Sequence, residues 1–315
     1  MESKHMKIFS GMSNHPLFED VCDYLDVSPG QMEITRFSDG EIFVDIRESV
    51  RGSNVFLIQS TCPPVNENIM ELLVITDALK RASARSITAV IPYYGYARQD
   101  RKVQPRAPIS AKLAADLIVV AGASKIVTMD LHAGQIQGFF DVPVTHLYAT
   151  PVIINHLREK YPNGELVIVS PDAGGVERAT EFADRTHSEI AICYKRRPAP
   201  NVAQISNIIG DVEDKHAVIV DDLVDTAGTA TEAARVLLSK GAKSVSLCCT
   251  HGVLSGPALD RINNSDIDEV IITNTIPQQE NQKKSEKITV LSIADLIGEA
   301  IRRTALGESI SALFT

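Results

Sequence analysis

Short runs that are apolar at nearly every position alternate along the chain with stretches in which apolar residues return every three or four positions. Such continuous apolar runs are typical of strands that are buried on both faces, as in parallel sheets, and the longer periodic stretches are typical of amphipathic helices. We expect strands at 54–59, 87–91, 125–129, 165–169, 216–220, 244–249 and 270–273, and helices at 67–84, 110–121, 229–240 and 294–306. This alternation predicts an α/β fold.

The two halves of the chain share this plan, which predicts two similar domains. One strand in each half ends on an acid, at Asp130 and at Asp221. We expect an N-terminal domain over 1–150 and a C-terminal domain over 151–304, each a mainly parallel sheet flanked by helices. The final segment, 305–315, carries apolar residues that fit docking at an edge better than a loose tail.

Composition and charge exclude several classes of protein. The 315 residues are 44% hydrophobic and 23% charged, which is enough to bury a large core and excludes global disorder. The net charge of −9 argues against non-specific binding to nucleic acid, and no apolar run is long enough to span a membrane. The five cysteines show no metal-binding spacing, and the N-terminus shows no apolar leader, so we expect reduced thiols and a cytoplasmic protein.

The most informative string lies at 218–229 and reads VIVDDLVDTAGT. A buried strand delivers Asp221 and Asp222 to its carboxyl end, where ligands bind in open α/β sheets. The turn after this pair brings backbone N–H groups to a helix N-terminus, which suits a phosphate. Because carboxylates repel phosphate, we expect this pair to accept hydrogen bonds from vicinal sugar hydroxyls. The whole string predicts a sugar-phosphate site, although a single Asp-Thr pair would more simply cap a helix.

Two further motifs carry positive charge beside features that suit a nucleotide. Lys195 begins the sequence KRRP on an expected mobile loop at 195–201, and mobile cations can stabilise the charge that develops in phosphoryl transfer. The segment 93–101 mixes tyrosines, which can stack on a purine, with arginines, which can grip phosphate. Taken alone, a basic tripeptide is more often a solvated loop, and the segment 93–101 fits an exposed loop with ordinary surface arginines about as well as a nucleotide site.

Together the motifs resemble those of the ribose-phosphate pyrophosphokinases of the phosphate-dependent class, within the phosphoribosyltransferase superfamily. They lie at 36–41 (RFSDGE), 92–101 (PYYGYARQDR), 130–140 (DLHAGQIQGFF), 170–175 (SPDAGG), 195–198 (KRRP) and 218–229. The resemblance runs from about residue 7 to residue 314 and implies two phosphoribosyltransferase-type domains. It implies transfer of the β,γ-diphosphoryl group of ATP to the C1 hydroxyl of ribose 5-phosphate. The products would be phosphoribosyl pyrophosphate, for nucleotide biosynthesis, and AMP.

The resemblance also implies roles for individual residues. The catalytic pair would be Lys195 and Arg197, and Mg²⁺ would be bound near His132 and Asp172, although Mg²⁺ prefers oxygen ligands. The residues implied for ATP are Phe37, Asp39, Gly40, Glu41, Arg98, Gln99, Asp100 and His132. The residues implied for ribose 5-phosphate are Asp221, Asp222, Asp225, Thr226, Ala227, Gly228 and Thr229.

Assembly and regulation are implied by the resemblance alone. Relatives form homohexamers in which the loop at 36–41 reaches the site of a neighbouring subunit, and their C-terminal segment, here 305–315, packs on the first domain. In relatives, inorganic phosphate activates and ADP inhibits. No nucleic-acid or membrane partner is expected.

Three other functions remain as alternatives. The first is a phosphoribosyltransferase that consumes phosphoribosyl pyrophosphate, against which the intact motifs at 36–41 and 195–198 argue. The second is a non-catalytic regulatory subunit, in which a disrupted cationic loop would be expected. The third is a sugar-phosphate-sensing transcription regulator, which would need a basic reading helix that the sequence lacks.

Overall fold

The computed structural model describes residues 6–162, 165–199 and 202–313, and their side chains except at 195–199, 202–206 and 312. The chain forms two compact units. The first comprises Met1–Tyr148, Thr275–Pro277 and Ser292–Thr315, and the second comprises Ala149–Asn274 and Gln278–Leu291. Within the described residues, no helix is both long and apolar enough to cross a membrane.

The first unit is built on a five-stranded sheet that is parallel throughout. Its strands are β1 (Met6–Ser10), β4 (Asn54–Ile58), β5 (Ser86–Ile91), β6 (Lys125–Met129) and β7 (Val144–Leu147), and they lie side by side in this same order. Because each strand is added on the same side of the one before it, the sheet is wound in a single direction.

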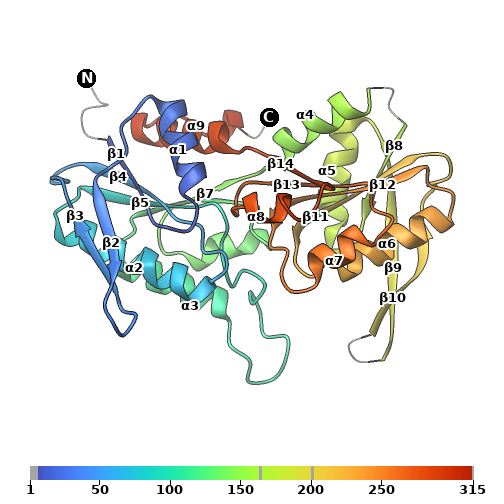
Figure 1. Ribbon diagram of the computed structural model, residues 1–315, viewed down its shortest axis with the longest axis horizontal. Coiled ribbons are helices and arrows are strands. Elements are labelled where there is room, and N and C mark those ends of the chain that lie inside the picture. Colours follow the sequence, from blue (N-terminus) through green and yellow to red (C-terminus); the bar gives the residue numbers. More distant parts are fainter. Residues whose placement is uncertain (1–5, 163–164, 200–201, 314–315) are drawn as a thin grey trace. The chain divides into compact units, whose positions relative to one another are not determined.

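Helices cover both faces of this sheet. They are α1 (His15–Leu25), α2 (Val65–Arg81), α3 (Ser110–Ala121) and α9 (Ala294–Leu306). Figure 1 shows α2 and α3 on one face and α1 with α9 on the other. α9 packs directly against α1, and Gly298 permits the contact, because a Cβ at that position would lie 2.4 Å from the Tyr24 ring. A hairpin of β2 (Met32–Arg36) and β3 (Ile42–Ile46) packs on α2.

The second unit contains a seven-stranded sheet in the order β10-β9-β8-β11-β12-β13-β14. The strands are β8 (Leu166–Ser170), β9 (Glu189–Ala199), β10 (Val202–Ile209), β11 (His216–Val224), β12 (Ser244–Gly252), β13 (Glu269–Thr273) and β14 (Ile288–Leu291). Only the β9–β10 pairing is antiparallel.

Helices again cover both faces, and the winding reverses between β8 and β11. The helices are α4 (Thr150–Lys160), α5 (Val176–Thr186), α6 (Gly228–Ser239), α7 (Ala258–Asn263) and α8 (Gln279–Gln282). The chain leaves β8 through α5 to β9 on one side, and leaves β11 through α6 to β12 on the other. α4 and α5 therefore lie on one face and α6 and α7 on the other (Figure 1). Such a reversal opens a crevice at the carboxyl ends of the two central strands.

The predicted α/β class with mainly parallel sheets is confirmed. The expected helices at 110–121 and 294–306 and the expected strand at 125–129 have the observed bounds, and the other expected elements match observed ones to within four residues at each end. The expected loop at 195–201 is wrong for its described part, because the backbone continues as strand β9 to Ala199 and pairs with β10. The compact units differ from the predicted division at 149–150, 275–277 and 292–304. The last of these ranges contains most of α9, which joins the first unit because it packs on α1.

Candidate functional site

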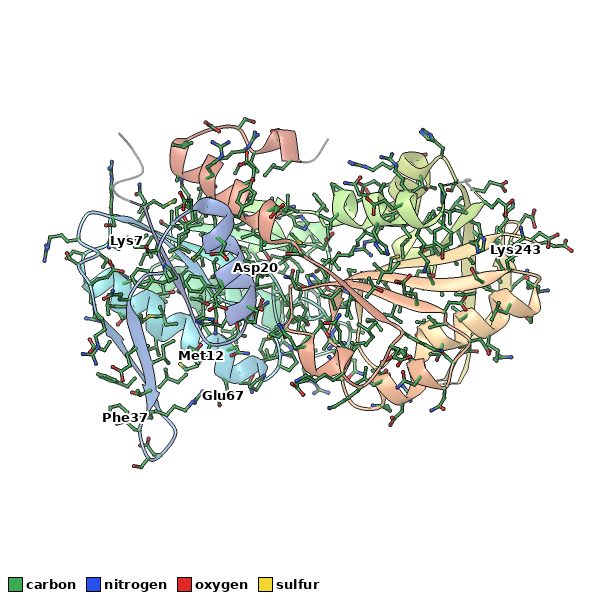
Figure 2. The ribbon with its side chains drawn as sticks, turned by 45° about the horizontal axis from the view of Figure 1, so that its top comes forward. Lys7, Met12, Asp20, Phe37, Glu67 and Lys243 are labelled. Carbon is green, nitrogen blue, oxygen red and sulfur yellow. The ribbon has the colours of Figure 1, made fainter. Side chains whose placement is uncertain are left out.

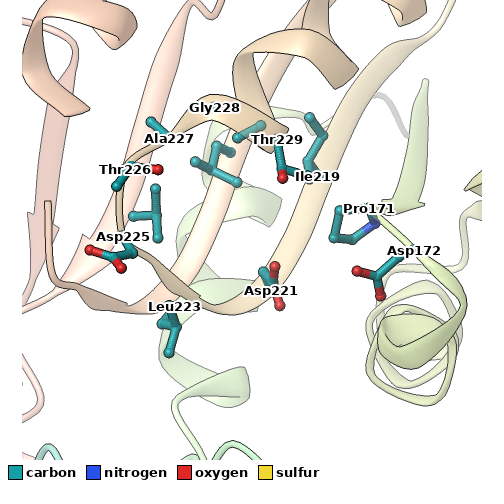
Figure 3. Close-up of a pocket in the computed structure, with 13 residues that line it drawn as sticks. Pro171, Asp172, Ile219, Asp221, Leu223, Asp225, Thr226, Ala227, Gly228 and Thr229 are labelled. Carbon is teal, nitrogen blue, oxygen red and sulfur yellow. The ribbon is translucent and has the colours of Figure 1, made fainter. Parts of the chain in front are cut away.

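A pocket of about 210 Å³ lies at the reversal point of the second sheet. One wall comes from Pro171 and Asp172, which follow β8, and the other comes from the end of β11 and the start of α6, between Asp221 and Ala230. Figure 3 shows Asp172 and Asp221 facing the same space, with the loop that leads to Thr229 around the other side. The sequence string at 218–229 and the SPDAGG motif therefore meet at one site.

The acidic pair of this pocket is held by an arginine from a neighbouring helix. Asp222 is buried, with 5% of its surface exposed, whereas the side chain of Asp221 is 35% exposed. The Nη1 atom of Arg178, on α5, lies 3.4 Å from Oδ1 of each carboxylate, and the N–H of Asp222 donates to Oδ1 of Asp221 over 2.9 Å. Burial raises the pKa of Asp221, and the negative charge of Asp222 raises it further, while Arg178 opposes both effects.

The electrostatics of the pair favour a ligand that donates hydrogen bonds. Two adjacent carboxylates that are partly removed from water repel each other, and one arginine at 3.4 Å offsets this repulsion only in part. A vicinal pair of sugar hydroxyls could donate to both carboxylates without adding charge. No local sequence pattern marks Arg178 as a site residue, because its contacts link α5 to β11 across 43 and 44 positions.

The loop after the pair, at 225–229, ends in an uncapped helix. Ala227 is the residue before α6, it has a left-handed φ of 59°, and no side chain in the described part of the chain caps α6. The first N–H groups of a helix lack intrahelical acceptors and carry partial positive charge. Together with the small residues Ala227 and Gly228, which let an anion approach the backbone, the loop suits a phosphate. Six of the seven residues predicted for ribose 5-phosphate line the pocket, whereas the seventh, Asp222, is buried and is not a lining residue.

The predicted ATP residues of the first unit cluster in part. Arg98, Gln99 and Asp100 follow β5, and Asp100 accepts a hydrogen bond from Gln135 over 3.2 Å, so this segment lies beside the one that follows His132. The hydroxyl of Ser110, at the start of α3, donates to Oε1 of Gln99 over 2.6 Å. Arg98, Gln99 and His132 are exposed.

The other predicted ATP residues lie on the β2–β3 hairpin. Asp39, Gly40 and Glu41 form its exposed turn, in which Gly40 has a φ of 96° that favours glycine. Phe37, with 55% of its surface exposed, packs edge-on against Phe43, which is 47% exposed, with 5.6 Å between the ring centroids (Figure 2 labels Phe37). Two exposed aromatic rings on a hairpin form an apolar surface of the kind found at binding interfaces.

The remaining predicted residues concern catalysis and metal binding. The backbone of Lys195 and Arg197 lies in β9, and their side chains are outside the described structure. Asp172 accepts the N–H of Gly174 over 3.0 Å, and it belongs to the second unit, whereas His132 belongs to the first. Within the described residues, no group of three or more His, Cys, Asp or Glu side chains is arranged to hold a metal ion.

The pocket lies at the reversal point of a mainly parallel sheet and combines an uncapped helix end with paired carboxylates. These features place the chain in the class of α/β proteins suited to a phosphorylated ligand with several hydroxyl groups. Comparisons with known proteins identify the family. The family model described as the N-terminal domain of ribose phosphate pyrophosphokinase matches residues 6–122, and the phosphoribosyl synthetase-associated domain matches residues 197–315.

Relatives match over nearly the full chain. The ribose-phosphate pyrophosphokinase of Clostridium tetani is 55% identical over 318 residues, which cover 99% of this chain and 98% of the relative. That of Caldanaerobacter subterraneus subsp. tengcongensis is 56% identical and covers 98% of each chain. The crystal structure of phosphoribosylpyrophosphate synthetase from Mycobacterium smegmatis matches with a TM-score of 0.91 and 43% identity, over 96% of this chain and 99% of that one. The chain belongs to the ribose-phosphate pyrophosphokinase family, and the family prediction from its motifs is confirmed.

Proposed function

We propose that the chain transfers the β,γ-diphosphoryl group of ATP to the C1 hydroxyl of D-ribose 5-phosphate, giving 5-phosphoribosyl 1-pyrophosphate and AMP for nucleotide biosynthesis. The observation that carries the proposal is the pocket at the β8–β11 reversal, in a chain of this family. The uncapped end of α6 takes the 5-phosphate, and Asp221 and Asp222 accept hydrogen bonds from the ribose hydroxyls. Bound in this way, the sugar is held at both ends and its C1 hydroxyl is presented to the nucleotide.

The reaction moves one diphosphoryl group between oxygen atoms. The C1 oxygen bonds to the β-phosphorus of ATP, the bond from that phosphorus to the α,β-bridging oxygen breaks, and the hydroxyl proton is released. Positioning and charge stabilisation supply most of the catalysis in such transfers. We assign the catalytic charge to Lys195 and Arg197, and ATP binding to Arg98, Gln99, Asp100 and His132. Phe37, Asp39, Gly40 and Glu41 of the hairpin complete this nucleotide set.

Mg²⁺ is the proposed metal. It prefers oxygen ligands and is commonly held by one or two carboxylates together with substrate phosphates, so the carboxylates of Asp172 and Asp221 on one pocket fit it. When bound, Mg²⁺ would neutralise charge on the phosphates. Asp172 is the proposed ligand in the second unit, and His132 is the proposed partner of Mg–ATP in the first.

The proposed assembly is a cytoplasmic homohexamer, activated by inorganic phosphate and inhibited by ADP. Exposed apolar side chains in the first unit support association with further copies. They include Phe37 and Phe43 on the hairpin and Leu113, Leu117 and Val120 on one face of α3, where Val120 is 75% exposed. Surfaces of this kind are typical of protein interfaces.

A product assay tests the activity. Purified protein is incubated with ATP, Mg²⁺ and ribose 5-phosphate, and the nucleotides are separated by chromatography. We expect AMP in equal amount to 5-phosphoribosyl 1-pyrophosphate, and no AMP when ribose 5-phosphate is omitted. ADP as the sole product would contradict the proposal, as would release of pyrophosphate that requires a free nucleobase, since that is the reaction of a phosphoribosyltransferase.

A further inference from the structure

Behind the 225–229 loop lies a second segment that none of the family motifs includes. It joins β12 to α7 at residues 253–257 and continues into α7 itself. Two of its residues have left-handed backbone conformations, Leu254 with a φ of 49° and Gly256 with a φ of 54°. Leu254 is buried in the core of the second unit, and a non-glycine residue in this conformation persists only where its surroundings hold it.

This segment and α7 donate hydrogen bonds to three consecutive carbonyl groups, at the end of β11 and the start of the 225–229 loop. The carbonyl oxygen of Val224 accepts N–H groups of the segment over 3.0 and 3.1 Å, and that of Asp225 accepts the N–H of Ser255 over 3.0 Å. The third carbonyl, of Thr226, accepts from Nη1 of Arg261, on α7, over 2.9 Å.

The direction of these carbonyls sets the direction of the N–H groups. In a planar trans peptide, the C=O of one residue and the N–H of the next point to opposite sides. When the carbonyls of Val224, Asp225 and Thr226 point toward the segment and α7, the N–H groups of the next residues point the other way. Those next residues, Asp225 to Ala227, line the pocket. The N–H of Ala227 is the one whose direction depends on a side chain, that of Arg261.

Arg261 touches the loop at a second point. A Cβ on Gly228 would lie 3.2 Å from Nη1 of Arg261, so the guanidinium lies close against the backbone where α6 begins. Ser255 adds a second side-chain anchor, because its hydroxyl donates to the carboxylate of Asp225. Both anchors act on the side of the loop that carries the bound carbonyls.

We propose that Arg261 is a positioning residue for the sugar phosphate, which holds the Thr226–Ala227 peptide so that its N–H faces the 5-phosphate, with Ser255 as a weaker second anchor. Arg261 acts through the loop and does not touch the reacting atoms. The inference rests on the proposed function for the identity of the ligand, ribose 5-phosphate.

The test compares Arg261→Ala with Arg235→Ala, which removes the same charge from an exposed position on the neighbouring helix α6. Titration calorimetry with ribose 5-phosphate alone measures binding without turnover. We expect Arg261→Ala to raise the Kd about fivefold, the size of one exposed hydrogen bond, and Arg235→Ala to leave it unchanged. Arg261→Lys, which retains a positively charged hydrogen-bond donor, should recover most of the loss. An unchanged Kd in Arg261→Ala, or equal loss in both alanine variants, would overturn the inference.

Steady-state kinetics then separate positioning from a general loss of structure. In Arg261→Ala the KM for ribose 5-phosphate should rise about fivefold, while the KM for ATP and kcat stay within twofold. A fall in kcat alone would place Arg261 at the reacting atoms and would contradict the proposal. If Arg261→Ala does not fold, the same calorimetry on Ser255→Ala tests the proposal. We then expect the Kd for ribose 5-phosphate to rise about twofold. Wild-type protein that binds ribose 5-phosphate but forms no AMP would contradict the proposed function and leave the calorimetric result standing.

Discussion

The two sheets of this molecule are wound differently, and the difference determines what each needs from the rest of the chain. In the second unit the winding reverses between β8 and β11, so helices fall on both faces and a ligand crevice opens at the reversal. In the first unit the strands succeed one another in chain order. Right-handed crossovers that all run in one direction place their helices on the same face of the sheet, and here these helices are α2 and α3. Other parts of the chain must then cover the opposite face.

The C-terminal helix supplies much of that cover. α9 packs with α1 on the face opposite α2 and α3, and its Ile297 and Ile301 are buried. The return of α9 to the first unit therefore covers a sheet face that the crossover helices α2 and α3 leave open. The second unit, which covers both faces with its own crossovers, can instead use its reversal point for binding.

The largest expected effect tests the catalytic role of the second unit near the antiparallel edge of its sheet. Lys195→Ala removes a proposed charge donor from β9, and we expect kcat to fall by about 10²–10³ with little change in the Kd for ribose 5-phosphate. Lys240→Ala, at an exposed position at the end of α6, should leave both unchanged. Initial rates of AMP formation and calorimetry measure the two quantities. Undiminished turnover in Lys195→Ala would remove β9 from the catalytic machinery.

The next effect tests the covering role of α9. Ile297 is 1% exposed, so Ile297→Ala should lower the free energy of unfolding by about 3 kcal/mol, through lost burial and the cavity left behind. Leu306→Ala, at the end of the same helix and 40% exposed, should change it by less than about 0.5 kcal/mol. Urea unfolding followed by circular dichroism measures both. Equal effects of the two variants would mean that the buried face of α9 does not stabilise the first unit.

A third effect asks whether the crevice of the second unit is built at the expense of stability. The pKa of Asp221 is raised in the folded protein, so the folded state binds more protons than the unfolded state between the ordinary and the raised pKa. The free energy of unfolding should therefore fall as the pH rises from about 4 to about 8, and Asp221→Asn should abolish this part of the fall. Because about a third of the side chain is exposed, we expect the variant to gain only about 1 kcal/mol at pH 9, and nothing near pH 4. Thermal melts across this pH range would show the difference, and a gain that is the same at both pH values would contradict the assignment.

The same contrast explains how much of the molecule could be predicted from sequence. The central strands β4, β5, β6, β8, β11, β12 and β13 and the helices α2, α3, α6 and α9 were predictable because their apolar patterns are local, whereas the other strands and helices of both units were not predicted. The string at 218–229 was predictable because one loop carries both the carboxylates and the helix start. Arg178 and Arg261 were not predictable, since each acts through a contact that spans 35 or more positions. The antiparallel pairing of β9 with β10 was missed because three cations and two prolines conceal a strand pattern. The direction of winding depends on which strands pair, which no single segment encodes.

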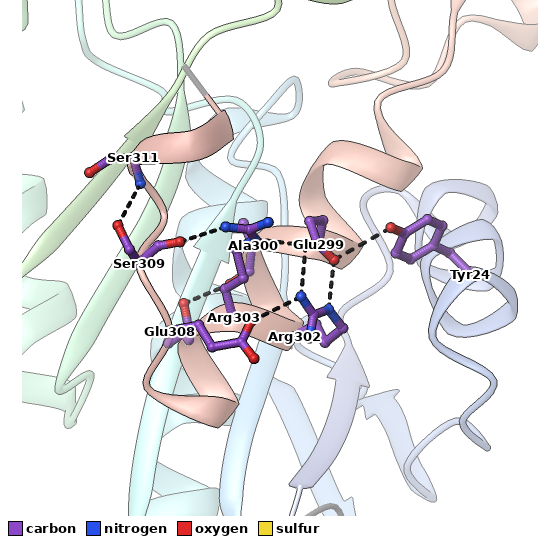
Figure 4. Close-up of polar contacts among 9 residues, drawn as sticks. Tyr24, Glu299, Ala300, Arg302, Arg303, Glu308, Ser309 and Ser311 are labelled. Atoms are coloured by element: carbon purple, nitrogen blue, oxygen red, sulfur yellow. Dashed lines mark hydrogen bonds and ion pairs between the residues drawn. The ribbon is translucent and has the colours of Figure 1, made fainter. Parts of the chain in front are cut away.

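The last expected effect, as small as the third, concerns the anchor of the C-terminal segment. It distinguishes the apolar cover that α9 provides from the charged contacts of that helix. Figure 4 shows Glu299 on α9 accepting hydrogen bonds from Arg302 and Arg303, with the Tyr24 hydroxyl of α1 at 3.5 Å. Arg303 also donates to the carbonyl of Ser309 over 2.8 Å, which ties the last described residues back to the helix.

These two arginines lower the pKa of Glu299 to about 2. A carboxyl whose pKa is lowered by folding stabilises the protein above its ordinary pKa of about 4.5 and loses that contribution as the pH falls toward 2. Glu299→Gln should therefore lower stability by about 1 kcal/mol at pH 7, and the gap to the wild type should narrow steadily between pH 5 and pH 3. The control is Asp20→Asn, at an exposed position on α1 (Figure 2). It should change neither the stability at pH 7 nor the dependence of stability on pH. Urea unfolding at these pH values measures the gap. A gap that does not close in acid would mean that Glu299 acts through packing alone, so that the cover over the first sheet depends on the apolar face of α9 and not on its charges.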